Sequence, residues 1–270
     1  MDLVTPGPTD DPRSAGNRSI QQLAQFEGTN VYHTLYLPAD WDPLWAAKSH
    51  RYPVIVEYTG NYYPVSGSTG SVDDANLGYG FTGGRGYIWI VVPSVDTERR
   101  RNERLWWGDI EATVGYCKNA VASVCRNFGG DADKLFICGF SRGGIATSHV
   151  GLYDEEISNL WRGFYAHDGL HGGGDWKFDG GDAATASIRA KRFRGRPVLI
   201  SYQEHYGRAG EIRRFVAQHQ DAATFTLLPI PVEQILDIPG DTIHPHTDLW
   251  MHKPSDYRDE ARDWLLHYTQ

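Results

Sequence analysis

The chain has 270 residues, 40% of them hydrophobic, which is enough for one large domain with a substantial core. Its 26 basic and 34 acidic residues give a net charge of −8. That balance argues against a nucleic-acid partner, because phosphate backbones are bound by positive surfaces. No apolar run reaches the roughly 18 residues that a membrane-spanning helix needs, so we expect no membrane span.

The start of the chain differs in composition from the rest. Residues 1–18 are rich in Pro, Gly, Asp and Ser, which predicts a mobile tail ahead of a single domain over 19–270. The tail does not have the pattern of a signal peptide, so we leave open a cytoplasmic protein and a secreted one whose leader has been removed. The cysteines do not suggest a disulfide framework: Cys117 and Cys125 fall too far apart along one predicted helix, and Cys138 falls in a predicted strand.

Predicted strands and helices alternate along the remaining chain. We predict strands over 31–37, 52–58, 87–92, 134–138, 160–166, 197–202 and 224–229, and helices over 109–128, 145–152, 211–220 and from Ser255 onward. Residues 60–86, rich in glycine and aromatic residues, are predicted to form a long loop that could cover a site. The alternation indicates the α/β class, with a largely parallel sheet, helices on both faces and no separate lid domain.

A serine between glycines joins the predicted strand 134–138 to the helix that follows. The segment Gly139-Phe140-Ser141-Arg142-Gly143-Gly144 has the pattern of a nucleophile elbow, a turn so tight that only glycine fits beside the serine. Ser141 would then project its hydroxyl at the edge of the sheet, near the positive end of the helix. The alternative is a glycine-rich turn with an incidental serine.

A serine nucleophile needs a histidine base and an acid that orients the base. In a fold with this elbow the chain order is Ser, acid, His. The loop after the last strand offers His246, which we prefer, and His244 as the alternative. Glu204, after the strand that ends at residue 202, is the preferred acid, and Asp168, after the preceding strand, is the alternative. No further ligands with metal-site spacing accompany the His-x-His pair, so we expect no metal and no cofactor.

Two backbone N–H groups must stabilise the oxyanion that forms during acyl transfer. One would belong to Arg142, the residue after the nucleophile. The other would come from the glycine-containing loop after the strand 52–58, where Asn61 or Tyr62 could present its N–H. An ordinary strand-to-loop turn is the alternative interpretation of that loop.

These segments together resemble the α/β-hydrolase superfamily, and within it esterases related to feruloyl esterases, polyhydroxybutyrate depolymerases and prolyl-oligopeptidase-like catalytic domains. The resemblance rests on residues 53–60, 133–144, 196–200 and 246–250 and extends over about 30–268. It implies an α/β-hydrolase fold and serine esterase chemistry. The chain departs from the family pattern in two places: Tyr58-Thr59-Gly60-Asn61 replaces the usual His-Gly oxyanion motif, and a glutamate replaces the usual aspartate after the seventh strand.

Aromatic residues are abundant, with nine Trp and fifteen Tyr. Aromatic faces stack on sugar rings and aromatic acyl groups. We take Tyr63, Trp107, Trp176 and Trp250 as candidate substrate-binding residues, with core packing as the alternative for each. Arg142 could also meet an acidic or hydroxyl-rich substrate, unless it is paired internally. We therefore predict a serine carboxylic-ester hydrolase acting on a carbohydrate or phenolic ester. A prolyl-oligopeptidase-like peptidase and an inactive binding protein are the alternatives.

Overall fold

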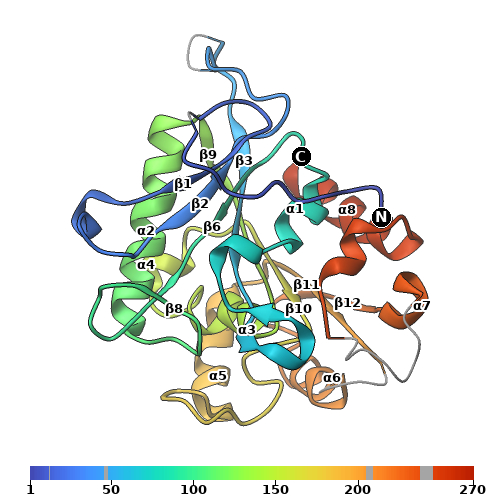
Figure 1. Ribbon diagram of the computed structural model, residues 1–270. Helices are drawn as coiled ribbons and strands as arrows, with labels where there is room; N and C mark the ends of the chain where they lie inside the picture. Colours follow the sequence, from blue (N-terminus) through green and yellow to red (C-terminus); the bar gives the residue numbers. More distant parts are fainter. Residues whose placement is uncertain (12, 46–47, 205–208, 238–245) are drawn as a thin grey trace.

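A twisted central sheet runs through the molecule, with helices on both of its faces (Figure 1). The computed structural model describes residues 1–11, 13–45, 48–204, 209–237 and 246–270. The strands of the sheet are β1 (Arg18–Gln21), β2 (His33–Tyr36), β3 (Tyr52–Tyr58), β6 (Ile88–Val91), β9 (Gly130–Phe140), β10 (Gly163–His167), β11 (Pro197–Tyr202) and β12 (Thr224–Pro229).

The order of the strands places β9 near the middle of the sheet. That order is β1-β2-β6-β3-β9-β10-β11-β12. β2 is antiparallel to β1 and β6, whereas all pairs from β6 to β12 are parallel. The carboxyl ends of the parallel strands therefore meet at one edge, which is where open α/β sheets bind their ligands. The prediction of a largely parallel sheet is confirmed.

Two hydrophobic cores cover the two faces of the sheet. Neighbouring strand residues point to opposite faces, so Val56 and Ile137 join one core whereas Ile55 and Phe136 join the other. This explains why β3 and the second half of β9, from Leu135 onward, are mostly apolar without alternation. The helices of the first face are α2 (Ile110–Asn127), α3 (Arg142–His149), α4 (Glu155–Ser158), α5 (Ala183–Ala190) and α6 (Ala209–Gln218), and those of the second are α1 (Leu77–Thr82), α7 (Val232–Leu236) and α8 (Asp256–Thr269).

The predicted elements agree with the structure where an apolar pattern or a cap marks them. Asp109 accepts a hydrogen bond from the N–H of Ala112 at the start of α2, and Ser255 caps α8 in the same way. The predicted loop 60–86 contains more structure than expected, including α1 with its two glycines, which weaken a helical pattern. The smaller elements are β4 (Tyr62–Tyr63), β5 (Ser68–Thr69), β7 (Ser94–Val95), β8 (Asn102–Glu103), η1 (Ala24–Phe26), η2 (Pro64–Ser66), η3 (Val72–Asp74), η4 (Lys191–Phe193) and η5 (Leu249–His252).

The first residues of the chain pack against its C-terminal part. The carboxylate of Asp2 accepts two hydrogen bonds from Arg258 of α8, at 2.6 and 2.9 Å. The N–H of Asp2 donates to the carbonyl of His252 at 3.0 Å. In Figure 1 the blue N-terminal segment ends beside the red helix α8. These contacts argue against the mobile tail that the composition of residues 1–18 predicts.

The three cysteines form no disulfide, as their spacing predicts. Burial raises the pKa of the Cys117 thiol to about 12 and that of Cys125 to about 11. Burial also holds the pKa of Cys138, in β9, well above its usual value. None of the helices within the described residues combines the length and the apolar character that crossing a membrane requires.

Candidate active site

Ser141 lies in a strained turn between β9 and α3. Its backbone angles are φ 57° and ψ −115°, a conformation that non-glycine residues rarely adopt. A Cβ at Gly139 would come within 2.2 Å of the Gly143 carbonyl carbon, and a Cβ at Gly143 within 1.8 Å of the Tyr58 carbonyl oxygen. Both positions therefore require glycine, and the turn has the local structure that the elbow motif predicts.

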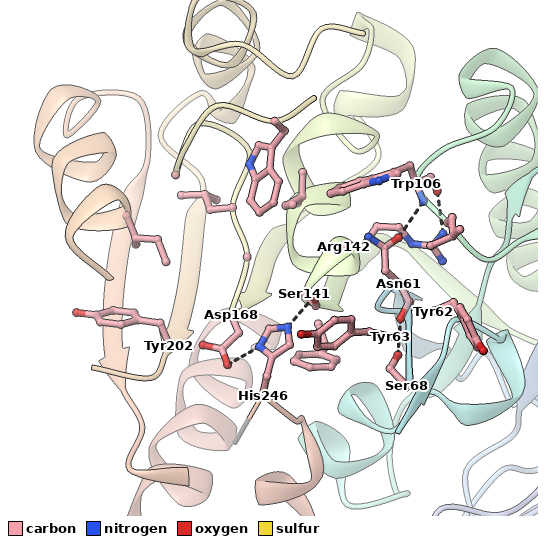
Figure 2. A pocket seen from close by; sticks show the side chains of 18 residues that line it. Asn61, Tyr62, Tyr63, Ser68, Trp106, Ser141, Arg142, Asp168, Tyr202 and His246 are labelled. Atoms are coloured by element: carbon pink, nitrogen blue, oxygen red, sulfur yellow. Dashed lines mark hydrogen bonds and ion pairs between the residues drawn. The ribbon is translucent and has the colours of Figure 1, made fainter. Parts of the chain in front are cut away.

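His246 lies between Ser141 and an acidic side chain, as Figure 2 shows. Its Nε2 atom is 2.8 Å from the Ser141 hydroxyl oxygen. Its Nδ1 atom is 3.3 Å from Oδ2 of Asp168. The two ring nitrogens are thus placed to accept the serine proton on one side and to donate to a carboxylate on the other. The other candidate base, His244, lies outside the described residues.

The preferred acid, Glu204, is a correction. Its carboxylate pairs with Arg213 of α6 at 2.6 Å, and both side chains are more than 40% exposed, at 42% and 47%. Asp168, which directly follows β10, supplies the carboxylate at His246 instead. The position after β11 is held by Gln203, whose backbone N–H and side-chain amide both donate to Asp168. The carboxylate beside His246 therefore comes from the end of β10, and the residue after β11 donates hydrogen bonds to it.

The surroundings of Asp168 favour its ionised form. Burial of the side chain, which is 6% exposed, would by itself raise the pKa. The neighbouring His167, the hydrogen bond to His246 and the hydrogen bond from Gln203 outweigh burial, so the pKa of Asp168 is lowered below its usual value. A carboxylate that stays charged near neutral pH stabilises a positive imidazolium beside it.

The candidate oxyanion donors have different surroundings. The N–H of Arg142 lies in the first turn of α3, where a helix has no earlier carbonyl to receive it. The N–H of Tyr62 donates to the carbonyl of Arg104 at 2.8 Å, so Tyr62 is not suited to the role predicted for it. Asn61 is fixed through its two oxygens: the side chain accepts from the N–H of Trp106 at 2.8 Å and the carbonyl from the hydroxyl of Ser68 at 2.6 Å. Figure 2 shows both contacts.

The side chain of Arg142 is paired internally with backbone and side-chain oxygens. Its guanidinium donates to the carbonyl of Trp106 at 2.8 Å, and to the hydroxyl and carbonyl of Thr59 at 3.2 and 3.4 Å. Burial lowers its pKa to about 10, so the group remains charged at neutral pH. Arg142 therefore ties the loop after β3 to the loop that carries Trp106.

A pocket of about 620 Å³ opens beside the Ser141 hydroxyl (Figure 2). Most of its lining is apolar or aromatic, which is typical of small-molecule sites. The lining residues are Asn61, Tyr62, Tyr63, Ser68, Leu105, Trp106, Phe140, Ser141, Arg142, Ile145, Asp168, Gly169, Leu170, Gly173, Trp176, Tyr202, Ile212 and His246. Within the described ranges, no group of three His, Cys, Asp or Glu side chains is arranged to hold a metal ion.

Two of the four predicted substrate-binding aromatics line this pocket, Tyr63 and Trp176. The other two are corrections. Trp107 is 5% exposed and packs its ring 4.9 Å from that of His149. Trp250 is fully buried in the second core. The residues next to Trp250 in the sequence do not predict its burial, because that burial depends on packing between distant segments.

Sequence reasoning did not place Tyr202 and Ile212 in the pocket, and it did not choose Trp106 among the preferred substrate-binding residues. The position of Tyr202 at the end of β11, on the edge that carries the elbow, is a signal that could have found it. Trp106 could not have been separated from Trp107 by composition, since the two are adjacent. Its φ of 52° turns the chain at that point.

The fold has many solved counterparts. A candidate dipeptidyl aminopeptidase IV from Bacteroides ovatus aligns with a TM-score of 0.59 and 14% identity over 94% of this chain and 35% of its own. A thermostable esterase gives 0.55 and 18% over 92% and 61%, and a ferulic acid esterase 0.53 and 14% over 94% and 97%. The chain thus spans about a third of the first protein, less than two thirds of the second and nearly all of the third.

These likenesses establish the α/β-hydrolase fold, which confirms the resemblance drawn from the sequence at the level of the fold. At identities of 14–18% they do not by themselves establish chemistry. No family model and no curated protein sequence matches the chain. The activity must therefore be argued from the residues at the strand ends.

Proposed function

We propose that this protein is a serine carboxylic-ester hydrolase with Ser141 as nucleophile, His246 as base and Asp168 as the acid that orients the base. The observation that carries the proposal is the continuous contact from Ser141 Oγ to His246 Nε2, at 2.8 Å, and from His246 Nδ1 to Asp168 Oδ2, at 3.3 Å. These groups are brought together from three separate segments of the chain, at the end of the sheet where this fold places its active sites.

The reaction proceeds in two halves. Ser141 Oγ attacks the ester carbonyl carbon while His246 Nε2 takes the hydroxyl proton, and the negative oxygen accepts hydrogen bonds from the N–H of Arg142 and of Asn61. The imidazolium then gives that proton to the departing alcohol oxygen, which leaves an acyl-enzyme. A water molecule repeats the attack with His246 as base, and the carboxylic acid departs from a regenerated Ser141.

The pocket supports an ester with a ring system as substrate. Tyr63, Trp106 and Trp176 present aromatic side chains beside the nucleophile, and such faces stack on phenolic groups and sugar rings. Because the Arg142 guanidinium is paired internally, it offers no free cation to an acidic substrate. We therefore favour a neutral carbohydrate or phenolic ester.

The described part of the pocket gives less support to an aminopeptidase-like activity. Recognition of a peptide N-terminus requires an anionic partner for its ammonium group. Among the described residues that line the pocket, Asp168 carries the single carboxylate, and it faces His246. The third possibility, an inactive binding protein, is disfavoured by the hydrogen-bonding distance between Ser141 and His246.

A fluorophosphonate probe tests the nucleophile directly, because it phosphonylates an activated serine with loss of fluoride. We expect the native protein to be labelled and the Ser141→Ala variant to remain unlabelled. Ser148→Ala is the matched control, since Ser148 lies in α3, the helix that follows Ser141, and outside the pocket. An unlabelled native protein would contradict the proposal.

A small substrate panel then separates the reaction classes. We expect release of alcohol from an aryl acetate, from methyl ferulate or from an acetylated oligosaccharide, and none of amine from a dipeptidyl anilide. Turnover of the anilide alone would replace the esterase by the peptidase. Labelling by the probe without turnover of any ester would leave Ser141 as nucleophile and overturn the substrate class.

A further inference from the structure

His167, the last residue of β10, contacts the chain beside all three residues of the proposed triad. Its carbonyl accepts the N–H of Ser141 at 2.8 Å, and it directly precedes Asp168. Its ring Nε2 lies 3.0 Å from the carbonyl of Thr247, the residue after His246. The ring is completely buried, so these contacts are not exchanged for water.

Two buried hydroxyl groups hold the imidazole of His167 on its Nδ1 side. Its Nδ1 lies 2.8 Å from the hydroxyl of Ser201 on β11, which in turn lies 3.0 Å from the hydroxyl of Tyr165. With the proton on Nε2, three hydrogen bonds form in a row: Tyr165 donates to Ser201, Ser201 donates to Nδ1, and Nε2–H donates to the Thr247 carbonyl. The other tautomer accepts at Nε2 from the Trp250 indole N–H at 3.1 Å.

Both tautomers bind the same segment of chain. Thr247 follows His246 directly, and Trp250 belongs to η5, which comes two residues after Thr247. Stacking adds to this hold, because the ring of Phe140 lies 5.5 Å from that of His167 and 4.7 Å from that of His246. Burial of the imidazole lowers its pKa, so the ring stays neutral and keeps one donor and one acceptor.

We propose that His167 is a positioning residue, which holds the His246 imidazole in line with Ser141 and Asp168 through Thr247 and Trp250. The proposal rests on the proposed esterase function and adds a residue that touches neither substrate nor the reacting atoms. A base displaced by a fraction of an ångström loses much of its effect, since proton transfer depends on hydrogen-bond geometry.

Three substitutions separate the hydrogen bonds of His167 from its bulk. His167→Phe keeps a ring against Phe140 but has no polar atom. His167→Asn places an amide near Nδ1, and His167→Gln places one near Nε2, where it can still donate to Thr247. On an aryl acetate we expect His167→Phe and His167→Asn to lower kcat by roughly 10- to 100-fold, with KM changed by less than about twofold. We expect His167→Gln to keep most of the native kcat.

The split between kcat and KM supplies a readout that a merely structural role would not move. A displaced His246 slows proton transfer, whereas substrate binding by the rest of the pocket stays intact, so His167→Phe should lower kcat and leave KM almost unchanged. His33 provides the matched control, since it is a buried histidine bonded to the Tyr116 hydroxyl at 2.9 Å and lies on β2, away from the pocket. We expect His33→Phe to leave kcat and KM unchanged.

Each outcome decides the proposal. A native kcat in His167→Phe would overturn it, as would an equal loss in His33→Phe. If His167→Phe does not fold, the comparison of His167→Gln with His167→Asn decides, and equal activity of these two variants would count against the role. An unlabelled native protein in the fluorophosphonate assay would instead overturn the proposed function, so the two failures are distinguishable.

Discussion

The turns that carry Ser141 and Asp168 lie at the ends of neighbouring strands, yet different forces hold them. Both residues have a positive φ, 57° and 49°. The serine turn is held by backbone packed on backbone, since Gly143 lies against the Tyr58 carbonyl with no room for a Cβ. The aspartate turn is held by hydrogen bonds from Gln203. A substitution in the serine turn should therefore disrupt the whole turn. The aspartate turn can instead be weakened by removing one hydrogen bond at a time.

The largest effect should come from the acid itself. Asp168→Asn removes the charge that stabilises the imidazolium and favours the wrong histidine tautomer, so we expect kcat on an aryl acetate to fall by on the order of 10³- to 10⁴-fold. The matched control is Glu204→Gln, which removes the carboxylate paired with Arg213 at the surface. Its kcat should stay native. Loss of activity in the glutamate variant instead would restore Glu204 as the acid.

A methyl group in the elbow tests the backbone packing of the serine turn. Gly143→Ala would place a Cβ against the Tyr58 carbonyl, so we expect the free energy of unfolding to fall by roughly 3 kcal/mol or more, with loss of turnover. Gly115→Ala is the control, because the same change in α2 meets no atom within 4 Å and should leave the protein as stable or slightly more so. Urea denaturation measures both. A native-like Gly143→Ala would show that the turn adapts.

Two buried histidines, one in the segment after each turn, contact each other and should make the packing of the two turns sensitive to low pH. His149 ends α3, His171 follows Asp168, and their rings lie 4.9 Å apart. Burial and the nearby Arg189 lower the pKa of His149 to about 2 and that of His171 to about 4. The unfolded chain binds these protons first, so stability is complete above pH 6.5 and is lost as the pH falls towards 4, by at most about 1.4 kcal/mol per pH unit for each histidine.

Urea denaturation at pH 7, 6 and 5 measures this dependence. His171→Gln removes one of the buried histidines whose pKa is lowered, so the variant should lose less stability per pH unit than the native protein. An identical slope in the two proteins would assign the acid sensitivity to other groups.

The smallest effect should come from a single bond to the acid. Gln203→Leu removes the side-chain donor and keeps the backbone donor, so we expect kcat/KM to fall by about tenfold with stability little changed. Gln21→Leu is the control, since Gln21 donates to Ser19 on the far edge of the sheet. A loss as large as that of Asp168→Asn would mean that this one bond sets the whole geometry.

The sequence predicts what local physics determines. The apolar strands, the caps at Asp109 and Ser255 and the glycines around Ser141 all act within a few residues, and the structure has them as expected. The acid could not be chosen in this way. Glu204 and Asp168 both follow strands that end at the same edge, and contacts between distant segments distinguish them: Asp168 meets His246 and Gln203, whereas Glu204 pairs with Arg213. Trp107 and Trp250 were misplaced for the same reason, because packing between distant segments buries them.

The three cysteines of the core have a practical consequence for experiments. Their raised pKa values leave almost no thiolate near neutral pH, and the thiolate is the form that reacts with alkylating reagents. Cys138 lies in the strand that leads to Ser141, yet its side chain is completely buried. A single cysteine introduced at the exposed Tyr62 should therefore accept a maleimide dye selectively, which would place a fluorescent reporter at the mouth of the pocket.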